Sequence, residues 1–224
     1  MTKPKTARRL LSVTMLTGAL VAGGTASASA EAAPATASAS VGSLDVEVGD
    51  EHVVTGDLAP CDVDGPLTAK ARGGFIGDFA RFAGGDSSCG RTGAVAVGEA
   101  SGRRFETTVL KQFGGPVIGV RMFKAKCSTT KDGSLGYIEF GDVSGFTLPE
   151  NVPQNYRLTI AGEKGGAALA SLTVNETVTP TPADGSLVTH MLHIKLFPQG
   201  GGPAKGDIYL GTARCDPYGK KKPA

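Results

Sequence analysis

Apolar and polar residues alternate along short segments of this chain, most regularly in its second half. In segment 187–197, alternate positions would line one face of an extended strand: Val188, His190, Leu192, Ile194 and Leu196. Similar segments are rich in β-branched and aromatic residues and are bounded by Gly, Pro or Asp. The predicted strands are 44–48, 53–56, 68–72, 94–97, 105–110, 117–127, 135–140, 156–160, 169–178, 187–197 and 207–213.

Turn-forming residues are frequent between these segments. The chain has 33 Gly and 13 Pro in 224 residues, and Lys-Asp-Gly at 131–133 predicts a hairpin between two strands. No segment has a convincing 3.6-residue apolar period, which disfavours long helices. We therefore predict an all-β fold, a single antiparallel β-sandwich or jelly-roll-like domain over residues 43–216 with two disulfides.

The first thirty residues have the three parts of a secretory signal peptide. A basic start is followed by a short apolar run at 10–22, and Ala28-Ser29-Ala30 supplies the small residues of a cleavage site. The apolar run is shorter than the ~20 residues that cross a bilayer, and no other segment resembles a membrane anchor. We expect export, cleavage after Ala30 and a flexible leader over residues 31–42.

The net charge of the chain is too small to attract a particular class of partner by itself. Lys and Arg number 23 against 21 Asp and Glu, a formal charge of +2, and loss of residues 1–30 would leave 19 basic against 21 acidic residues. This balance disfavours nucleic acid as a partner. The tail at 217–224 carries Lys220, Lys221 and Lys222, which are candidate contacts to anionic cell-wall polymers or keep the end solvated.

Four cysteines suit an exported protein with two disulfides, and three connectivities are open. Cys61 and Cys89 bracket a Gly-rich stretch of high conformational entropy, so we pair these two, which leaves Cys127 to pair with Cys215. No pair has the C-x-x-C spacing that is typical of structural zinc sites, and we expect neither a metal nor a cofactor.

The second half of the chain resembles a family of actinobacterial exported proteins, the choice-of-anchor P family, over residues 118–216. The segments that carry the resemblance are VRMFKAKCST at 120–129, GYIEFGDVSG at 136–145, NVPQNYRLTI at 151–160, SLTVNETV at 171–178, VTHMLHIKL at 188–196 and GDIYLGTARC at 206–215.

This resemblance implies a secreted or surface β-rich protein without an assigned activity. It also implies that Cys127 and Cys215 are the family's cysteine pair, and that Asn175, Glu176 and His193 are its recurring polar positions. Members of the family often continue into an anchoring segment, whereas this chain ends nine residues after Cys215, which favours release or non-covalent association with the wall.

Constellations that could support catalysis are weak. Gly-Asp-Ser-Ser at 85–88, with His52 and Asp57 upstream, resembles a serine-protease segment but lacks the glycines that follow the nucleophile. His190 and His193 are three residues apart in a predicted strand, so we expect them on opposite faces, unable to bind one metal ion together. We therefore expect no catalytic residues.

The leading hypothesis is a non-enzymatic secreted or cell-envelope-associated structural or interaction protein. The alternative is a secreted binding protein for a glycan or a partner protein such as a protease, with its site on loops at 73–102. The sequence GGFIGDFARFAGG at 73–85 concentrates aromatic and basic residues among glycines, and its candidate binding residues, together with the preceding arginine, are Arg72, Phe75, Phe79, Arg81 and Phe82.

Overall fold

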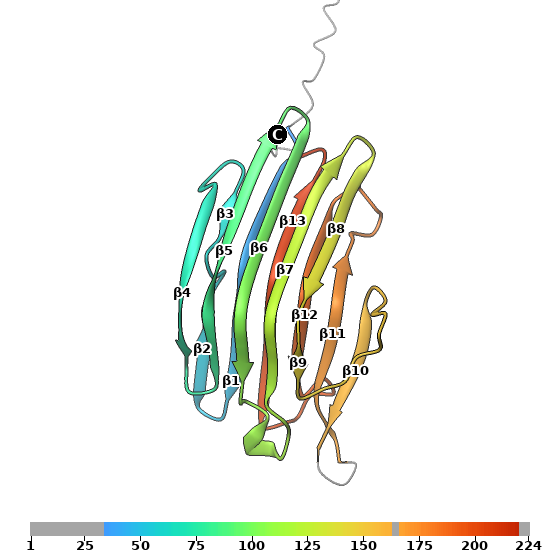
Figure 1. Cartoon of the computed structure of the whole chain (residues 1–224). Helices are drawn as coiled ribbons and strands as arrows, with labels where there is room; N and C mark the ends of the chain where they lie inside the picture. The colour runs from blue at the N-terminus through green and yellow to red at the C-terminus, as the bar shows by residue number, and fades with distance from the viewer. Residues whose placement is uncertain (1–33, 163–165, 220–224) are drawn as a thin grey trace, which may run out of the picture. The chain divides into compact units, whose positions relative to one another are not determined.

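The computed structural model describes residues 34–162 and 166–219, which form two antiparallel β-sheets packed face to face (Figure 1). The predicted signal peptide and Lys220, Lys221 and Lys222 lie outside the described residues. Sheet A consists of β1 (Thr36–Val48), β2 (Glu51–Val54), β3 (Cys61–Asp62), β10 (Tyr156–Ala161), β11 (Ala168–Val178), β12 (Leu187–Leu196) and β13 (Ala204–Asp216). Sheet B consists of β4 (Thr68–Ile76), β5 (Ala80–Thr92), β6 (Val95–Thr107), β7 (Ile118–Thr130), β8 (Gly133–Phe140) and β9 (Val143–Ser144).

Most neighbouring strands within a sheet are also consecutive in the chain. Sheet B has the order β4-β5-β6-β7-β8 with β9 beside β7, and sheet A has the order β10-β11-β12-β13-β1-β2 with β3 beside β1. Antiparallel neighbours need only short connections, and the hairpin predicted at 131–133 joins β7 to β8. The predicted antiparallel β-sandwich is confirmed.

Two clusters of very different side-chain size fill the space between the sheets. The larger one holds Leu, Ile, Val, Met and Phe side chains, with Phe105, Phe123, Leu192 and Ile208 among its members. The smaller one is made almost entirely of alanine and cysteine: Ala35, Ala37, Ala39, Cys61, Cys89, Ala96, Ala100, Ala125, Cys127, Leu187, Ala213 and Cys215.

Both disulfides lie in the small-residue cluster, and each joins one sheet to the other. Cys61 of β3 is bonded to Cys89 of β5, and Cys127 of β7 to Cys215 of β13, so the predicted pairing is confirmed. Here a Cβ atom at Gly98 of β6 would lie 2.7 Å from the carbonyl oxygen of Ser38 in β1, so the backbones of the two sheets come closer than the usual ~10 Å. Alanine side chains permit this close approach, so the sandwich is thin at its disulfide end.

Halfway along the central strands of sheet A, the alternation of inward- and outward-facing side chains shifts by one residue, which is here called a slip of the pleat. In β12 the residues of the core clusters are Leu187 and Met191 at odd-numbered positions, followed by Leu192, Ile194 and Leu196 at even-numbered positions. His190 is buried as well. Met191 lies opposite Gly211 of β13, which lies opposite Val41 of β1. None of these three residues is among the regular pairs of the strand register. Gly211 and Asn175, the residue of β11 at the same level, have φ of 58° and 54°.

Sheet B has a matching slip. In β6, alternate residues are buried up to Gly102, and burial resumes at Phe105 after two exposed residues, Arg103 and Arg104. Arg104 has φ of 51°, a left-handed conformation that is uncommon for residues other than glycine. Arg104 and its neighbour in β7, Arg121, are likewise absent from the regular pairs of the strand register.

The two slips lie at the same level of the sandwich, where Phe123 packs between the sheets. A Cβ atom at Gly102 would overlap the Phe123 ring, and one at Gly211 would lie 3.1 Å from Phe123 Cδ2 and 3.2 Å from Met191 Cβ. This level separates the alanine and cysteine cluster from most of the larger side chains.

Two segments differ from the sequence expectations. β1 begins at Thr36, inside the segment expected as a flexible leader (31–42), because its alternating alanines fill the thin end of the core. Residues 73–102, expected as loops, lie mostly in β4, β5 and β6, where glycines let adjacent strands approach. Within the described residues, no helix is long and apolar enough to cross a membrane.

We expect Gly211→Ala to destabilise the fold by about 1–3 kcal/mol, because the new methyl group meets Phe123, Met191 and Ala125 at a left-handed backbone position. Urea denaturation at neutral pH measures the effect. Gly90→Ala is the matched control, since a Cβ there has no neighbour within 4 Å, and it should change stability by less than ~0.5 kcal/mol. Equal stabilities of the two variants would contradict the close packing at Gly211.

Candidate functional site

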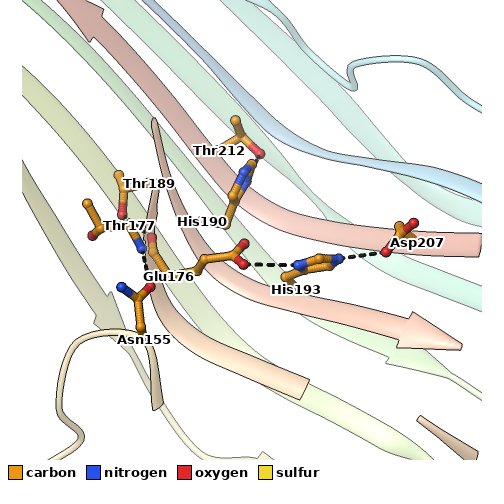
Figure 2. A network of polar contacts seen from close by, with 8 residues as sticks. All are labelled: Asn155, Glu176, Thr177, Thr189, His190, His193, Asp207 and Thr212. Atoms are coloured by element: carbon orange, nitrogen blue, oxygen red, sulfur yellow. Dashed lines mark hydrogen bonds and ion pairs between the residues drawn. The ribbon is translucent and has the colours of Figure 1, made fainter. Parts of the chain in front are cut away.

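A network of polar side chains lies on the outer face of sheet A, across β11, β12 and β13 (Figure 2). His193 lies between two carboxylates, with Nδ1 3.1 Å from Glu176 Oε1 and Nε2 2.7 Å from Asp207 Oδ1. His190 Nδ1 shares a hydrogen bond of 2.9 Å with Thr212 Oγ1. The network thus joins three strands by side-chain contacts in addition to their backbone ladders.

The two histidines lie on the same face of the sheet. Both imidazole rings contact Tyr209, with ring centroids 4.6 Å apart for His190 and 4.3 Å apart for His193. The prediction that they face opposite sides is therefore wrong. It assumed an unbroken pleat, whereas Met191 and Leu192 both turn inward and leave the residues on either side of them pointing outward.

Side chains replace backbone hydrogen bonds where the pleat slips in β11. Asn155 Oδ1 accepts a hydrogen bond of 2.7 Å from the backbone N–H of Thr177, and the backbone N–H of Asn155 donates to the carbonyl oxygen of Asn175. The Thr189 hydroxyl donates to the carbonyl oxygen of Glu176 at 2.9 Å (Figure 2). These contacts satisfy groups that a regular ladder would have paired.

The two imidazoles have opposite pKa shifts because their surroundings differ. Burial lowers the pKa of His190 to about 4, so this ring is neutral at pH 7. Burial alone would also lower the pKa of His193, but hydrogen bonds to Asp207 and Glu176 outweigh it and raise the pKa to about 9. A neutral and a charged imidazole therefore lie beside the same tyrosine.

This arrangement holds neighbouring strands together. Protonated His193 donates both N–H groups to carboxylates and has no lone pair to accept a proton. Thr212, whose hydroxyl contacts His190, is 1% exposed. In the described part of the chain, no group of three His, Cys, Asp or Glu side chains is placed to hold a metal ion.

The serine-protease-like residues of the sequence are not brought together. Ser87 is buried, and its hydroxyl donates to the carbonyl oxygen of Ala59 at 2.6 Å. His52 contacts Asp45 at 2.8 Å, and Asp57 accepts a hydrogen bond from Ser40. The described structure therefore has no Ser87–His52 contact of the kind that a hydrolase would need.

The outer face of sheet B carries a groove of about 530 Å³, here called the Phe75 groove, bordered by β4, β5, β6, β7 and β9. Two ion pairs line it. Arg81 donates from Nε and Nη2 to Glu106 Oε2 at 3.0 and 2.6 Å, and Arg121 Nη1 donates to Asp142 Oδ2 at 2.9 Å. The Phe75 side chain, 80% exposed, lies among these polar pairs at the groove.

The structure places three of the five candidate binding residues in this groove. Phe75, Arg81 and Phe82 line it, with Phe82 partly buried against the core. Phe79 is 6% exposed and belongs to the core, because β5 begins just after it and its side chain points between the sheets. Arg72 is exposed on β4 beside the groove.

A second groove of about 380 Å³, the Met122 groove, lies along the same face and includes Arg103, whereas Arg104 lines the Phe75 groove. These consecutive arginines mark where the two grooves meet. They are not among the candidate residues predicted from the sequence. The signal was present as two charged residues in succession within an otherwise alternating segment, which a regular strand would divide between its two faces.

Comparison of the chain with protein-family models, with curated proteins and with solved structures finds no match.

We expect the two histidines to give a stability maximum near pH 6.5. The folded-state pKa of His190 is about 4, below its unfolded value of ~6.5, so stability falls as pH drops from 6.5 to 4. The folded-state pKa of His193 is about 9, so its stabilisation is complete below pH 6.5 and is lost as pH rises to 9. Urea denaturation between pH 4 and 10 measures both limbs.

A matched pair of variants tests the alkaline limb of this profile. His193→Gln should remove the alkaline loss, whereas His52→Gln, at an exposed histidine paired with Asp45 outside the network, should leave it unchanged. An alkaline limb that persists in His193→Gln would show that another group causes it.

Proposed function

We propose that this chain is a non-enzymatic extracellular interaction protein that binds a glycan in the Phe75 groove. The observation that carries the proposal is the exposed Phe75 ring beside two Arg–carboxylate pairs in an open groove. An aromatic face offers a flat apolar surface for a sugar ring, and the fixed guanidinium and carboxylate groups offer donors and acceptors to its hydroxyls.

The ion pairs orient the guanidinium groups at the groove, and Arg81–Glu106 is the less exposed of the two. The Glu106 and Asp142 carboxylates hold the Arg81 and Arg121 guanidiniums in place by charge-assisted hydrogen bonds. Each carboxylate has lone pairs left for a ligand hydroxyl, and each guanidinium has further N–H groups. A preorganised surface loses less side-chain entropy on binding than a mobile one.

Extracellular location is supported by the covalent structure. Two disulfides that join the sheets favour a chain that folds in an oxidising compartment, as the predicted signal peptide requires. The resemblance to the choice-of-anchor P family adds the expectation of a secreted or surface protein of actinobacterial type. Retention at the cell wall through the basic tail belongs to this proposal as well.

Phe75→Ala should lower the affinity for a bound polysaccharide at least tenfold, while the free energy of unfolding changes by less than ~0.5 kcal/mol because the ring is exposed. Affinity electrophoresis through gels containing soluble polysaccharides identifies the ligand, and isothermal titration gives the affinity. Leu135→Ala is the control, since this side chain is 64% exposed on β8 of the same sheet. Equal affinities of the parent and Phe75→Ala would contradict the proposed site.

The non-enzymatic character has its own test. The bound polysaccharide should keep its length distribution and its content of reducing ends after prolonged incubation with the protein. New reducing ends would make the protein a glycoside hydrolase and overturn this part of the proposal.

A further inference from the structure

Small residues form a shallow floor beside the Phe75 groove, where β4 meets β5. Gly73 and Gly84 bring the two strands close together, since a Cβ at Gly73 would lie 2.6 Å from the backbone of Ala83 and one at Gly84 2.9 Å from the backbone of Ala71. A Cβ at Gly74 would point into open space. No large side chain therefore rises from this part of the sheet.

Three arginines surround the floor. Arg72 of β4 and Arg103 of β6 lie on either side of Gly84 in the strand register, and Arg104 follows Arg103. Residues opposite each other in adjacent strands share a face, and two strand spacings separate the Cα atoms of Arg72 and Arg103 by about 10 Å. Two extended arginine side chains can reach a single anion between them at this separation.

These arginines have no acidic partner, unlike three other basic residues of the same face. Arg81 is paired with Glu106, Arg121 with Asp142 and Lys124 with Glu99. Among the residues that the structure describes, no carboxylate lies within ion-pair distance of the three that surround the floor: Arg72, Arg103 and Arg104.

The backbone at Arg104 holds this arrangement at a cost. A left-handed conformation is unfavourable for a residue with a Cβ atom, and glycine would adopt it without strain. The conformation places Arg103 and Arg104 together on the outer face and returns Phe105 to the core. The chain thus carries a long charged side chain where stability alone would favour glycine.

We propose that the cluster of Arg72, Arg103 and Arg104 binds the carboxylate or phosphate groups of an anionic polysaccharide that runs across the outer face of sheet B. This inference rests on the proposed function and specifies its ligand class. Unpaired guanidiniums form bidentate, charge-assisted hydrogen bonds with carboxylates and phosphates, and the glycine floor leaves room for the backbone of the polymer. The Phe75 groove would hold a sugar ring of the same chain.

The test measures the binding of polymers of different charge to the chain without its predicted signal peptide. The probes are polygalacturonate, a phosphomannan, neutral dextran and β-glucan, and a single-stranded oligonucleotide. The variants are Arg72→Gln combined with Arg103→Gln, and Arg104→Gly, which suits the left-handed backbone and so preserves the fold. Arg157→Gln, at an exposed arginine on β10 of the other sheet, controls for the loss of a positive charge.

The proposal predicts binding to at least one of the two anionic polysaccharides that weakens as salt rises from 0.05 to 0.5 M, on the order of tenfold or more, because salt screens the attraction. Arg72→Gln with Arg103→Gln, and Arg104→Gly alone, should each weaken this binding at least tenfold. Arg157→Gln should bind as the parent does, and Arg104→Gly should unfold at a urea concentration no lower than the parent.

Three other outcomes overturn the inference. Binding of neutral and anionic polysaccharides with equal affinity, lost in Phe75→Ala and unchanged in the arginine variants, would leave the glycan site standing and remove the anionic subsite. Preference for the oligonucleotide over every polysaccharide would assign the arginine cluster to a different class of polymer. Binding of no polysaccharide of either charge would remove both the inference and the proposed function.

Discussion

The short distance between the sheets at the disulfide end is the constraint on which the rest of the sandwich depends. Both inter-sheet disulfides lie at this end, where a Cβ at Gly98 would lie 2.7 Å from the Ser38 backbone of the other sheet, and the surrounding core residues are almost all alanine and cysteine. Toward the other end the core holds Leu, Ile and Phe side chains, which require the ordinary ~10 Å spacing. The sandwich must therefore change thickness along the length of its strands.

The chain accommodates this change by slipping the pleat in both sheets at one level. On sheet A the slip turns Met191 and Leu192 inward and leaves His190 and His193 together on the outer face. On sheet B it turns Arg103 and Arg104 outward together. One adjustment of packing thus creates the polar network on one face and the paired arginines on the other.

The sequence predicts the class of fold well, because strand periodicity, turn residues and cysteine spacing are local signals. The positions of the six predicted strands in the second half agree with β7, β8, β10, β11, β12 and β13, and both disulfides pair as expected. Local signals mark the slip in sheet B only by the adjacent Arg103 and Arg104 and do not reveal the slip in sheet A, because a change of parity follows from the side chains of the opposite sheet. Phe123 and Gly211, for example, are 88 residues apart and meet only after the sheets pack.

The same reason explains the errors at the candidate sites. Phe79 and Phe75 look equivalent in a glycine-rich segment, yet one lies in the core and the other is exposed, since the turn between β4 and β5 separates them. Ala35, Ala37 and Ala39 look like a flexible stretch, because their contribution depends on a thin core that the sequence does not announce. Asp207 joins His193 only through the register of β12 and β13.

The pairing of Thr36 with Asp216 determines how the domain resists mechanical force. A pull applied between these two residues acts at one end of the β1–β13 ladder, so its hydrogen bonds break one after another rather than all at once. β13 is fastened to sheet B through Cys215, whereas no cysteine lies in β1. Under such a load β1 peels away first, while the disulfides keep the two sheets joined.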